Sequence, residues 1–507
     1  MPGSHDADEL IAASADPGAA RLALERHDID ALAASGSLAA AVALYGASRW
    51  VVDAMAVDPG ATAVLAALDD PVDVGAAQDD RDLVRRHRRE LLRVGARDLL
   101  GLDDLGATVV ALSDAAAGAI RASLRLAGAD GAVAVVAMGK LGGRELNFAS
   151  DVDLLLVAAD PEASEAALRR AMASLRGCVR VDLGLRPEGR DGALVRSVEG
   201  YEAHWRRWSE PWERQALLKA AVVAGDDDLG REWEDAAARA VWERSFTADD
   251  IRSIRALKER AEAEVARRPG GERDVKRGLG GIRDVEFAVQ LLCLVHGGPD
   301  PTLRVRGTVA ALAELAAGGY VALDDATALA EAYASLRRVE HRLQLVDLAP
   351  AHVLPDDGAG LDRLARSLGE RATAERSAGD ALIAALRAHR ATARRVHERL
   401  WFRPLLGAFA GRDRALAAFG FADAERTTEG IAELSRGLTR SSRLMQQLLP
   451  LVLDWLSRSP APDLGLLGLR RLADGPAPRN RRTCRAARSA AAWAPGRQTN
   501  TRSRSDG

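Results

Sequence analysis

Short continuous apolar runs stand out in a chain whose apolar residues otherwise recur at helical spacing. Runs at residues 133–137 and 153–157 are rich in Val and Leu and too short for buried helices, so we predict two buried strands. A third run at 179–183 and a weaker one at 193–196 predict further strands. Residues 161–176 have helical spacing, and a helix between two strands is typical of a βαβ-like unit on a small mixed sheet.

Helical patterns fill most of the remaining chain. Pro and Gly residues mark the breaks between the helices. The apolar stripe within residues 326–348 is the clearest pattern, and we interpret it as a core face. We predict helices at residues 39–55, 80–100, 103–126, 199–209, 212–224, 251–267, 282–296, 302–317, 326–348, 375–399 and 427–457.

This pattern predicts an α+β protein that is mostly helical, with several regions because 507 residues exceed one typical core. Residues 475–507 carry eight arginines against one acidic residue, Asp506, and have no apolar periodicity. We expect disorder or out-of-frame translation there, with a basic RNA- or membrane-binding arm as the alternative. The expected regions are a flexible leader (1–20), an N-terminal helical region (21–130), an α/β core (131–225), a helical bundle (226–472) and the tail (473–507).

The composition and charge of the chain argue against several classes of function. The net charge of −3 gives no electrostatic case for nucleic acid or an anionic membrane. Cys178, Cys293 and Cys484 are too widely spaced for a disulfide framework or a zinc site, which favours a reducing cytosol. The N-terminus lacks a signal-peptide pattern, and no apolar run approaches the ~20 residues that span a bilayer. We therefore expect a cytoplasmic protein with no membrane or nucleic-acid partner.

Three acidic residues carry the candidate chemistry. Asp151 and Asp153 begin the second apolar run, and Asp182 lies in the third. Side chains two residues apart share one face of a strand, and a neighbouring strand brings a third side chain close. Converging carboxylates repel unless a hard dication lies between them, and Mg²⁺ prefers oxygen ligands completed by substrate phosphates. We predict that these three residues bind Mg²⁺ and support in-line displacement at phosphorus.

A glycine-rich turn precedes the acidic residues. Gly139, Gly142 and Gly143 permit close approach of backbone N–H groups to a phosphate, and the start of a helical turn adds partial positive charge. Lys140 and Arg144 flank these glycines. We expect them to contact a triphosphate or orthophosphate, with ordinary surface charges as the alternative.

A second basic segment follows Asp182. Arg186 and Arg190 lie in the loop LRPEGRDG, where they would neutralise phosphate. An ion pair within the loop, involving Glu188, is the alternative. The order of strand, glycine turn, Asp-x-Asp strand, helix and Asp-bearing strand predicts nucleotidyl transfer.

Five motifs together resemble the signature of the bifunctional glutamine synthetase adenylyltransferase/adenylyl-removing enzymes. The resemblance covers roughly residues 22–472 and implies a polymerase-β-like nucleotidyltransferase domain flanked by helical bundles. It implies Asp151 and Asp153 as metal ligands, with Asp182 as the third. The motifs are GKLGGRELNFASDVDL (139–154), DLGLRPEGR (182–190), WERQALLK (212–219), GGIRDVEF (280–287) and LRRVEHRL (336–343).

The resemblance also implies contacts with phosphate. Gly142 and Gly143 match the nucleotide-phosphate turn of the family. Lys219 lies in another family motif, either as a nucleotide contact or in a structural ion pair with a neighbour such as Glu213.

The resemblance finally implies a substrate. Members of the family carry two nucleotidyltransferase halves. The N-terminal half is associated with removing AMP from a tyrosine of glutamine synthetase by phosphorolysis, which releases ADP, and the C-terminal half with attaching AMP from ATP. This chain has one Gly-Gly…Asp-x-Asp set and resembles a truncated adenylyl-removing half. A PII signalling protein is implied as a partner, with glutamine and 2-oxoglutarate as effectors.

Three other functions stay open at this point. The same fold can run forward, as an ATP-dependent adenylyltransferase acting on glutamine synthetase. A truncated product can serve only as a binding module. A nucleic-acid polymerase or tRNA-modifying enzyme is disfavoured by the acidic net charge.

Overall fold

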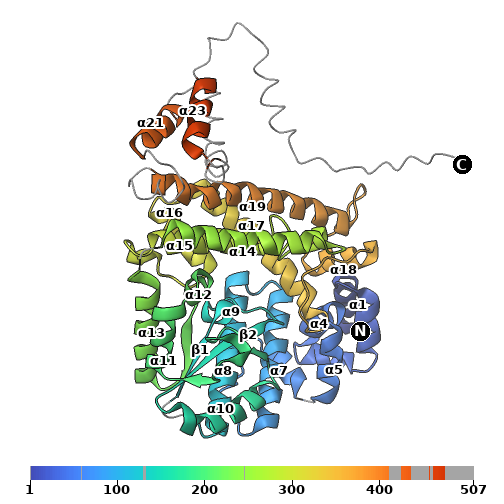
Figure 1. The fold of residues 1–507 in the computed structure, drawn as a ribbon. Coiled ribbons are helices and arrows are strands. Elements are labelled where there is room, and N and C mark those ends of the chain that lie inside the picture. Colours follow the sequence, from blue (N-terminus) through green and yellow to red (C-terminus); the bar gives the residue numbers. More distant parts are fainter. Residues whose placement is uncertain are drawn as a thin grey trace, which may run out of the picture. The chain divides into compact units, whose positions relative to one another are not determined.

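A computed structural model describes residues 2–58, 60–129, 133–244, 246–409, 424–435, 456 and 461–473 (Figure 1). The chain divides into two compact units, Met1–Pro404 and Leu405–Gly507. The second unit contains α21 (Ala424–Ser435) and α23 (Pro462–Ala473), which pack against each other. The expected helix at 427–457 and the expected tail lie largely outside the described residues.

Helices form the N-terminal part of the first unit, including the segment expected to be a flexible leader. Ala7 and Ile11 of α1 and Ala20 of α2 are buried in the core of this helical region. The prediction of a loose leader is therefore wrong, because these few apolar residues suffice to pack α1 and α2 on α4. The helices are α1 (Pro2–Ala13), α2 (Pro17–Leu24), α3 (Ile29–Ala34), α4 (Leu38–Ala47), α5 (Arg49–Val57) and α6 (Ala61–Ala66).

The helix expected at residues 39–55 is broken at Ser48. This residue has an extended backbone with φ −143° and ψ 121°. Its hydroxyl accepts a hydrogen bond from the Val51 N–H and caps α5. A serine that bonds the backbone in this way favours a new helix start over the middle of a helix.

A mixed sheet lies at the centre of the first unit. β1 (Val133–Ala137) pairs antiparallel with β2 (Asp151–Ala158) on one side and with β5 (Ala221–Gly225) on the other. The other edge of β2 pairs in parallel with β3 (Arg180–Asp182) and β4 (Val195–Arg196). All four predicted strands are present, and the expected α+β, mostly helical fold is confirmed.

The fifth strand was not predicted. Residues 212–224 were expected to form one helix, but α12 (Pro211–Leu217) ends early and β5 follows. A short apolar run fits a helix or a strand equally well by periodicity. At Gly225, φ is +106° and an added Cβ would lie 2.1 Å from the Val133 carbonyl oxygen, so the close pairing with β1 depends on glycine.

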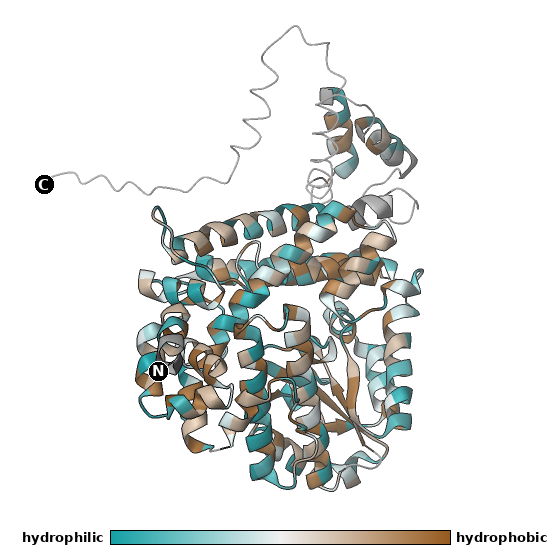
Figure 2. Cartoon of the chain, turned by 180° about the vertical axis from the view of Figure 1, so that it is seen from behind, coloured by the Kyte–Doolittle hydropathy of each residue, from teal (hydrophilic) through white to brown (hydrophobic). Residues whose placement is uncertain are grey.

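Helices cover both faces of the sheet, which is why its strands are continuous apolar runs. Val133 and Val135 pack towards α7 (Asp80–Leu99), α8 (Leu105–Leu126) and α10 (Pro161–Leu175), whereas Ala134 and Val136 pack towards α11 (Val198–Trp208) and α13 (Asp227–Trp242). The strands are the most hydrophobic layer of this region (Figure 2). Helices from both sides of the expected boundaries at residues 130 and 225 share these cores, so those boundaries do not separate domains.

One of the described helices, α8, is long and apolar enough to cross a membrane. It packs against α7, α10 and β5, and more than half of its apolar window is buried inside the protein. We therefore describe it as a core helix of the sheet region.

A helical bundle completes the first unit. Its core is formed by the apolar face of α17 and its neighbours, as the stripe within residues 326–348 predicts. α14 and α19 lie side by side (Figure 1), joined by an ion pair of 3.3 Å between Arg394 Nη1 and Glu262 Oε1. The helices are α14 (Ala248–Ala266), α15 (Ile282–His296), α16 (Thr308–Ala317), α17 (Leu323–Leu345), α18 (Gly358–Ser367) and α19 (Ala378–Phe409), with short 3₁₀ turns η1 (Gly189–Asp191), η2 (Gly271–Arg273) and η3 (Pro301–Leu303).

Candidate active site

The three predicted carboxylates meet at the start of β2. Asp151 and Asp153 lie on one face of this strand, with Val152 buried on the other. β3 pairs with β2 so that Asp182 is the direct partner of Asp153. Partners in a parallel pair project to the same face. The structure therefore brings together the three residues that the sequence singled out.

Like charge and burial dominate the electrostatics of this site. Burial, together with the charges of the neighbouring Asp182 and Asp151, raises the pKa of Asp153 to about 6. Asp151 Oδ1 lies 3.0 Å from Nε of Arg180. Asp182 Oδ1 accepts a hydrogen bond of 2.7 Å from the Gly184 N–H. Among the described residues, the structure gives Asp153 no direct cationic partner, whereas Asp151 and Asp182 each have one polar contact that offsets part of their charge.

The donor set fits a hard dication bound in an open site. Within the described ranges, no group of three or more His, Cys, Asp or Glu side chains is arranged to hold a metal ion, and this includes Asp151, Asp153 and Asp182 as they stand. Mg²⁺ does not need such a cage, since it keeps several waters and takes one or two carboxylates together with substrate phosphates. Two carboxylates side by side, one with a raised pKa, match that requirement. Arg180 must release Asp151 for all three to bind.

The glycine-rich turn packs directly against these acids. It forms the short helix α9 (Gly139–Gly142) immediately after β1. At Gly139, φ is +56° and an added Cβ would lie 3.0 Å from Asp153 Oδ2. An added Cβ at Gly142 would lie 1.8 Å from the Lys219 carbonyl oxygen. The backbone of Gly142 therefore packs closely against the backbone at Lys219. For Gly143, the nearest atom to an added Cβ is the Arg306 carbonyl oxygen at 3.2 Å.

Replacing Gly142 with alanine is expected to destabilise the protein by about 1–3 kcal/mol, the usual range for overpacking a well-packed interior. The obstructing atom is backbone, so relief requires movement of α9 or of the segment before β5. Gly358→Ala is the matched control, because nothing lies within 4 Å of its added Cβ. Thermal unfolding of both variants measures the effect. Equal melting temperatures for the two would contradict the close packing at Gly142.

The predicted basic residues occupy different surroundings. Lys219 is buried, and its ammonium group donates to Glu145 Oε2 at 2.7 Å and to the Thr308 hydroxyl at 2.8 Å. Lys219 therefore forms a structural ion pair with Glu145, since Glu213 bonds His204 at 2.8 Å instead. A nucleotide contact of Lys219 stays a prediction.

Arg144 is exposed and pairs with Asp114 at 2.8 Å. Arg186 donates to the carbonyl oxygens of Leu183, Arg190 and Gly192, so it organises its own loop.

Arg190 is exposed on that loop. Glu188 pairs with Arg196 of β4 at 2.9 Å, outside the loop sequence. The loop that follows Asp182 is therefore held by its own polar contacts, with Arg190 as its exposed cation.

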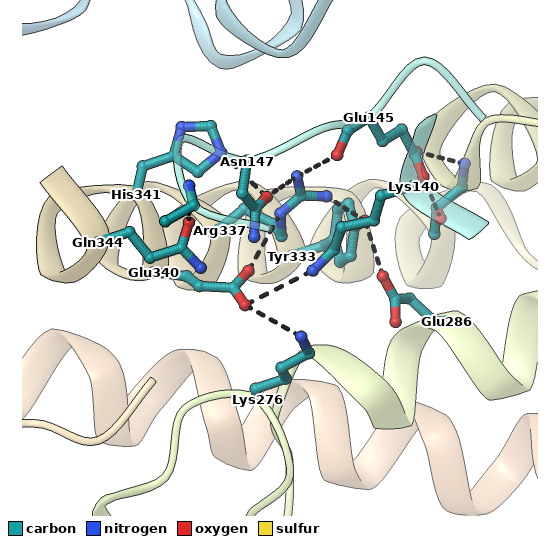
Figure 3. A network of polar contacts seen from close by, with 12 residues as sticks. Lys140, Glu145, Asn147, Lys276, Glu286, Tyr333, Arg337, Glu340, His341 and Gln344 are labelled. Atoms are coloured by element: carbon teal, nitrogen blue, oxygen red, sulfur yellow. Dashed lines mark hydrogen bonds and ion pairs between the residues drawn. The ribbon is translucent and has the colours of Figure 1, made fainter. Parts of the chain in front are cut away.

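A buried polar network joins the segment between the glycine-rich turn and Asp151 to the helical bundle (Figure 3). Arg337 of α17 donates to the Glu145 carbonyl oxygen at 2.7 Å and to Asn147 Oδ1 at 2.5 Å. Gln344 Oε1 accepts from the Ala149 N–H at 3.0 Å. The segment between the glycines and Asp151 is thus fixed from α17, two hundred residues along the chain from it.

Sequence reasoning missed two charged residues next to Lys140. Lys140 Nζ and Lys276 Nζ each lie 3.5 Å from Glu340 Oε1. Glu340 was quoted only as part of a motif, and Lys276 was not singled out. Their approach depends on long-range packing, and no local spacing signals it.

Comparisons with known proteins identify relatives of this chain. A family profile described as glutamate-ammonia ligase adenylyltransferase matches residues 52–175 and 168–236, and one described as GlnD PII-uridylyltransferase matches residues 254–401. A bifunctional glutamine synthetase adenylyltransferase/adenylyl-removing enzyme of Streptomyces avermitilis is 38% identical, over 92% of this chain and 52% of its own length. The protein of the same name from Streptomyces coelicolor is 42% identical, over 78% of this chain and 43% of its own length. The chain is therefore similar to the glutamine synthetase adenylyltransferases. It spans about half the length of the curated relatives that it matches.

The similarity to this nucleotidyltransferase family extends to the motifs that form the polar network. Motifs that lie far apart in the sequence meet around one turn: Glu145 and Asn147 come from the first motif, Lys219 from the third, and Arg337 and Glu340 from the fifth. In this chain, these residues hold the turn that precedes Asp151 and Asp153. Their role in the structure is therefore to position the candidate site.

Proposed function

We propose that this protein removes AMP from an adenylylated tyrosine of glutamine synthetase by Mg²⁺-dependent phosphorolysis, releasing ADP. The observation that carries the proposal is the meeting of Asp151, Asp153 and Asp182 on one face of β2 and β3, beside a glycine turn. The names of the relatives supply the substrate class. The resemblance of the motifs to the adenylyl-removing half of the family supports the removing direction.

Each group has a stated part in this proposal. Asp151, Asp153 and Asp182 would hold Mg²⁺, which neutralises charge on the phosphoryl oxygens and on the leaving phenolate. α9 places the backbone of Gly139 against Asp153, which fixes the carboxylate before substrate binds. Lys140, Arg144, Arg186 and Arg190 remain proposed phosphate contacts. The buried pairing of Lys219 favours a positioning role instead.

The proposal extends to partners. Glutamine synthetase is the protein substrate, and the encounter takes place in the cytoplasm. The match of residues 254–401 to a PII-uridylyltransferase profile supports a PII protein as a regulatory partner of the helical bundle. Glutamine and 2-oxoglutarate are the proposed effectors.

Incubation of adenylylated glutamine synthetase with the protein, phosphate and Mg²⁺ tests the proposal. ADP release that depends on phosphate is expected, and a variant with Asp151→Asn and Asp153→Asn should release none. Labelled AMP transfer from ATP onto unmodified glutamine synthetase, without phosphate-dependent ADP release, would instead favour the adenylyltransferase direction. Stable binding of glutamine synthetase without either reaction would favour a binding module.

A further inference from the structure

Two lysines from distant parts of the chain converge on one buried carboxylate. Lys140 belongs to α9, and Lys276 lies in the loop between η2 and α15. Both ammonium groups lie 3.5 Å from Oε1 of Glu340 (Figure 3). Among the described residues, these ion pairs are the contacts that the structure gives either ammonium group, and neither donates a closer hydrogen bond.

Glu340 alone does not balance the positive charge around it. Glu340 is completely buried, and a third cation, Arg337, lies 3.5 Å from its other oxygen. Although burial opposes the shift, Lys140, Lys276 and Arg337 together lower the pKa of Glu340 to about 2. Burial lowers the pKa of Lys140 to about 7, whereas the charges of Glu340 and of Glu286 on α15 act to raise it. Three basic side chains therefore face two carboxylates, and a further anion bound here would favour the charged form of Lys140.

This positive charge lies beside the candidate active site. Lys140 directly follows Gly139, whose backbone packs against Asp153. The charges of Lys276 and Lys140 both act to lower the pKa of Asp153, against burial and the two neighbouring aspartates. The side chain of Lys140 is 11% exposed and that of Lys276 is 30% exposed, so neither side chain is completely buried. An anion bound to these lysines would lie near Asp153, because Lys140 directly follows Gly139.

We propose that Lys140 and Lys276, which converge on Glu340, bind the inorganic phosphate that attacks the adenylyl group. The inference rests on the proposed function. Ammonium groups are compact point charges that suit a tetrahedral oxyanion. The helical bundle then supplies half of the phosphate site, since Lys276 lies outside the sheet region.

The reaction balances with phosphate in this position. An oxygen of HPO₄²⁻ attacks the phosphorus of the adenylyl group and forms the anhydride bond of ADP. The bond from that phosphorus to the tyrosine oxygen breaks, and the phosphate proton ends on the phenolic oxygen. Adenylyl-tyrosine with one negative charge and HPO₄²⁻ with two give ADP with three charges and neutral tyrosine. The bound phosphate becomes the β-phosphate of ADP.

The Lys276→Met variant tests the inference through the dependence of ADP release on phosphate concentration. We expect the KM for phosphate to rise at least about tenfold, the size of one charge-assisted contact of 1.4 kcal/mol or more. The KM for adenylylated glutamine synthetase should change less than about twofold. Lys276→Arg should recover part of the affinity. Arg277→Gln is the matched control, because it removes one positive charge from the next position of the same loop.

Two outcomes would overturn the phosphate site. One is an unchanged KM for phosphate in Lys276→Met, and the other is an equal rise in Arg277→Gln. Titration with inorganic phosphate and Mg²⁺ in a calorimeter separates this inference from the proposed function. If the wild type releases no ADP but binds phosphate at least about tenfold more tightly than Lys276→Met, the site stands and the proposed reaction fails. Equal phosphate binding by both proteins overturns the site.

Discussion

Replacing Asp153 with asparagine is expected to lower phosphorolytic turnover by about 10³-fold, a loss typical of removing one electrostatic contact made in a transition state. Asp153 is the central carboxylate, since it pairs with Asp182 across the strands and shares a face with Asp151. The amide keeps the shape of the side chain and removes its charge. Asp235→Asn, at an exposed position of α13, is the control and should retain full activity.

The same variant is expected to be more stable than the wild type when no divalent cation is present. The pKa of Asp153 is raised to about 6, so the folded state holds this proton more tightly than the unfolded state, where the value is about 3.8. The stability that this proton contributes is therefore fully present below about pH 4 and is lost as the pH rises through about 6. The loss is roughly 3 kcal/mol at pH 8. Asp153→Asn removes it.

Thermal unfolding of both proteins at pH 4 and pH 8, with and without Mg²⁺, measures this effect. The stability advantage of the variant should appear at pH 8, vanish towards pH 4 and shrink when Mg²⁺ stabilises the wild type. An Asp153→Asn protein that is inactive and also less stable at pH 8 would show that the carboxylate supports the fold, and the metal assignment would lose its basis.

Local chemistry explains which parts of this site were predictable. Asp151 and Asp153 were identified because the two-residue period of a strand fixes which side chains share a face. Asp182 followed from the βαβ-like order, which puts β3 beside β2. These inferences need only the neighbouring residues and one chain connection.

The missed features depend on partners that are distant in sequence. The run that forms β5 reads equally well as the end of a helix, and its pairing with β1 decides the outcome. Lys276 and Glu340 approach Lys140 only because the helical bundle packs against the glycine-rich turn. The leader gave no strong pattern, and α4 provides the surface on which α1 folds. In each case, packing between distant segments overrode or supplied the local signal.

Replacing Arg337 with methionine is expected to cost about 3–5 kcal/mol of stability, the range for breaking a buried ion pair. The Arg337 side chain is 1% exposed. It donates to the Tyr333 hydroxyl at 2.7 Å, in addition to its bonds to Glu145 and Asn147. Methionine fills much of the volume but leaves these buried acceptors without a hydrogen-bond donor. A buried acceptor without a partner is costly, because it has lost its bonds to water without gaining a bond inside the protein.

Arg338→Met is the matched control for this prediction, because it is the next residue of α17 but exposed. A surface substitution of this kind usually changes stability by less than about 0.5 kcal/mol. Urea unfolding of the two variants should therefore differ by several kcal/mol. Arg337→Met should also lower the rate of ADP release at urea concentrations below those that unfold the variant, because Asn147 lies in the turn that leads to Asp151. If both variants unfold alike, the network does not hold the turn, and the three motifs meet there without a stabilising role.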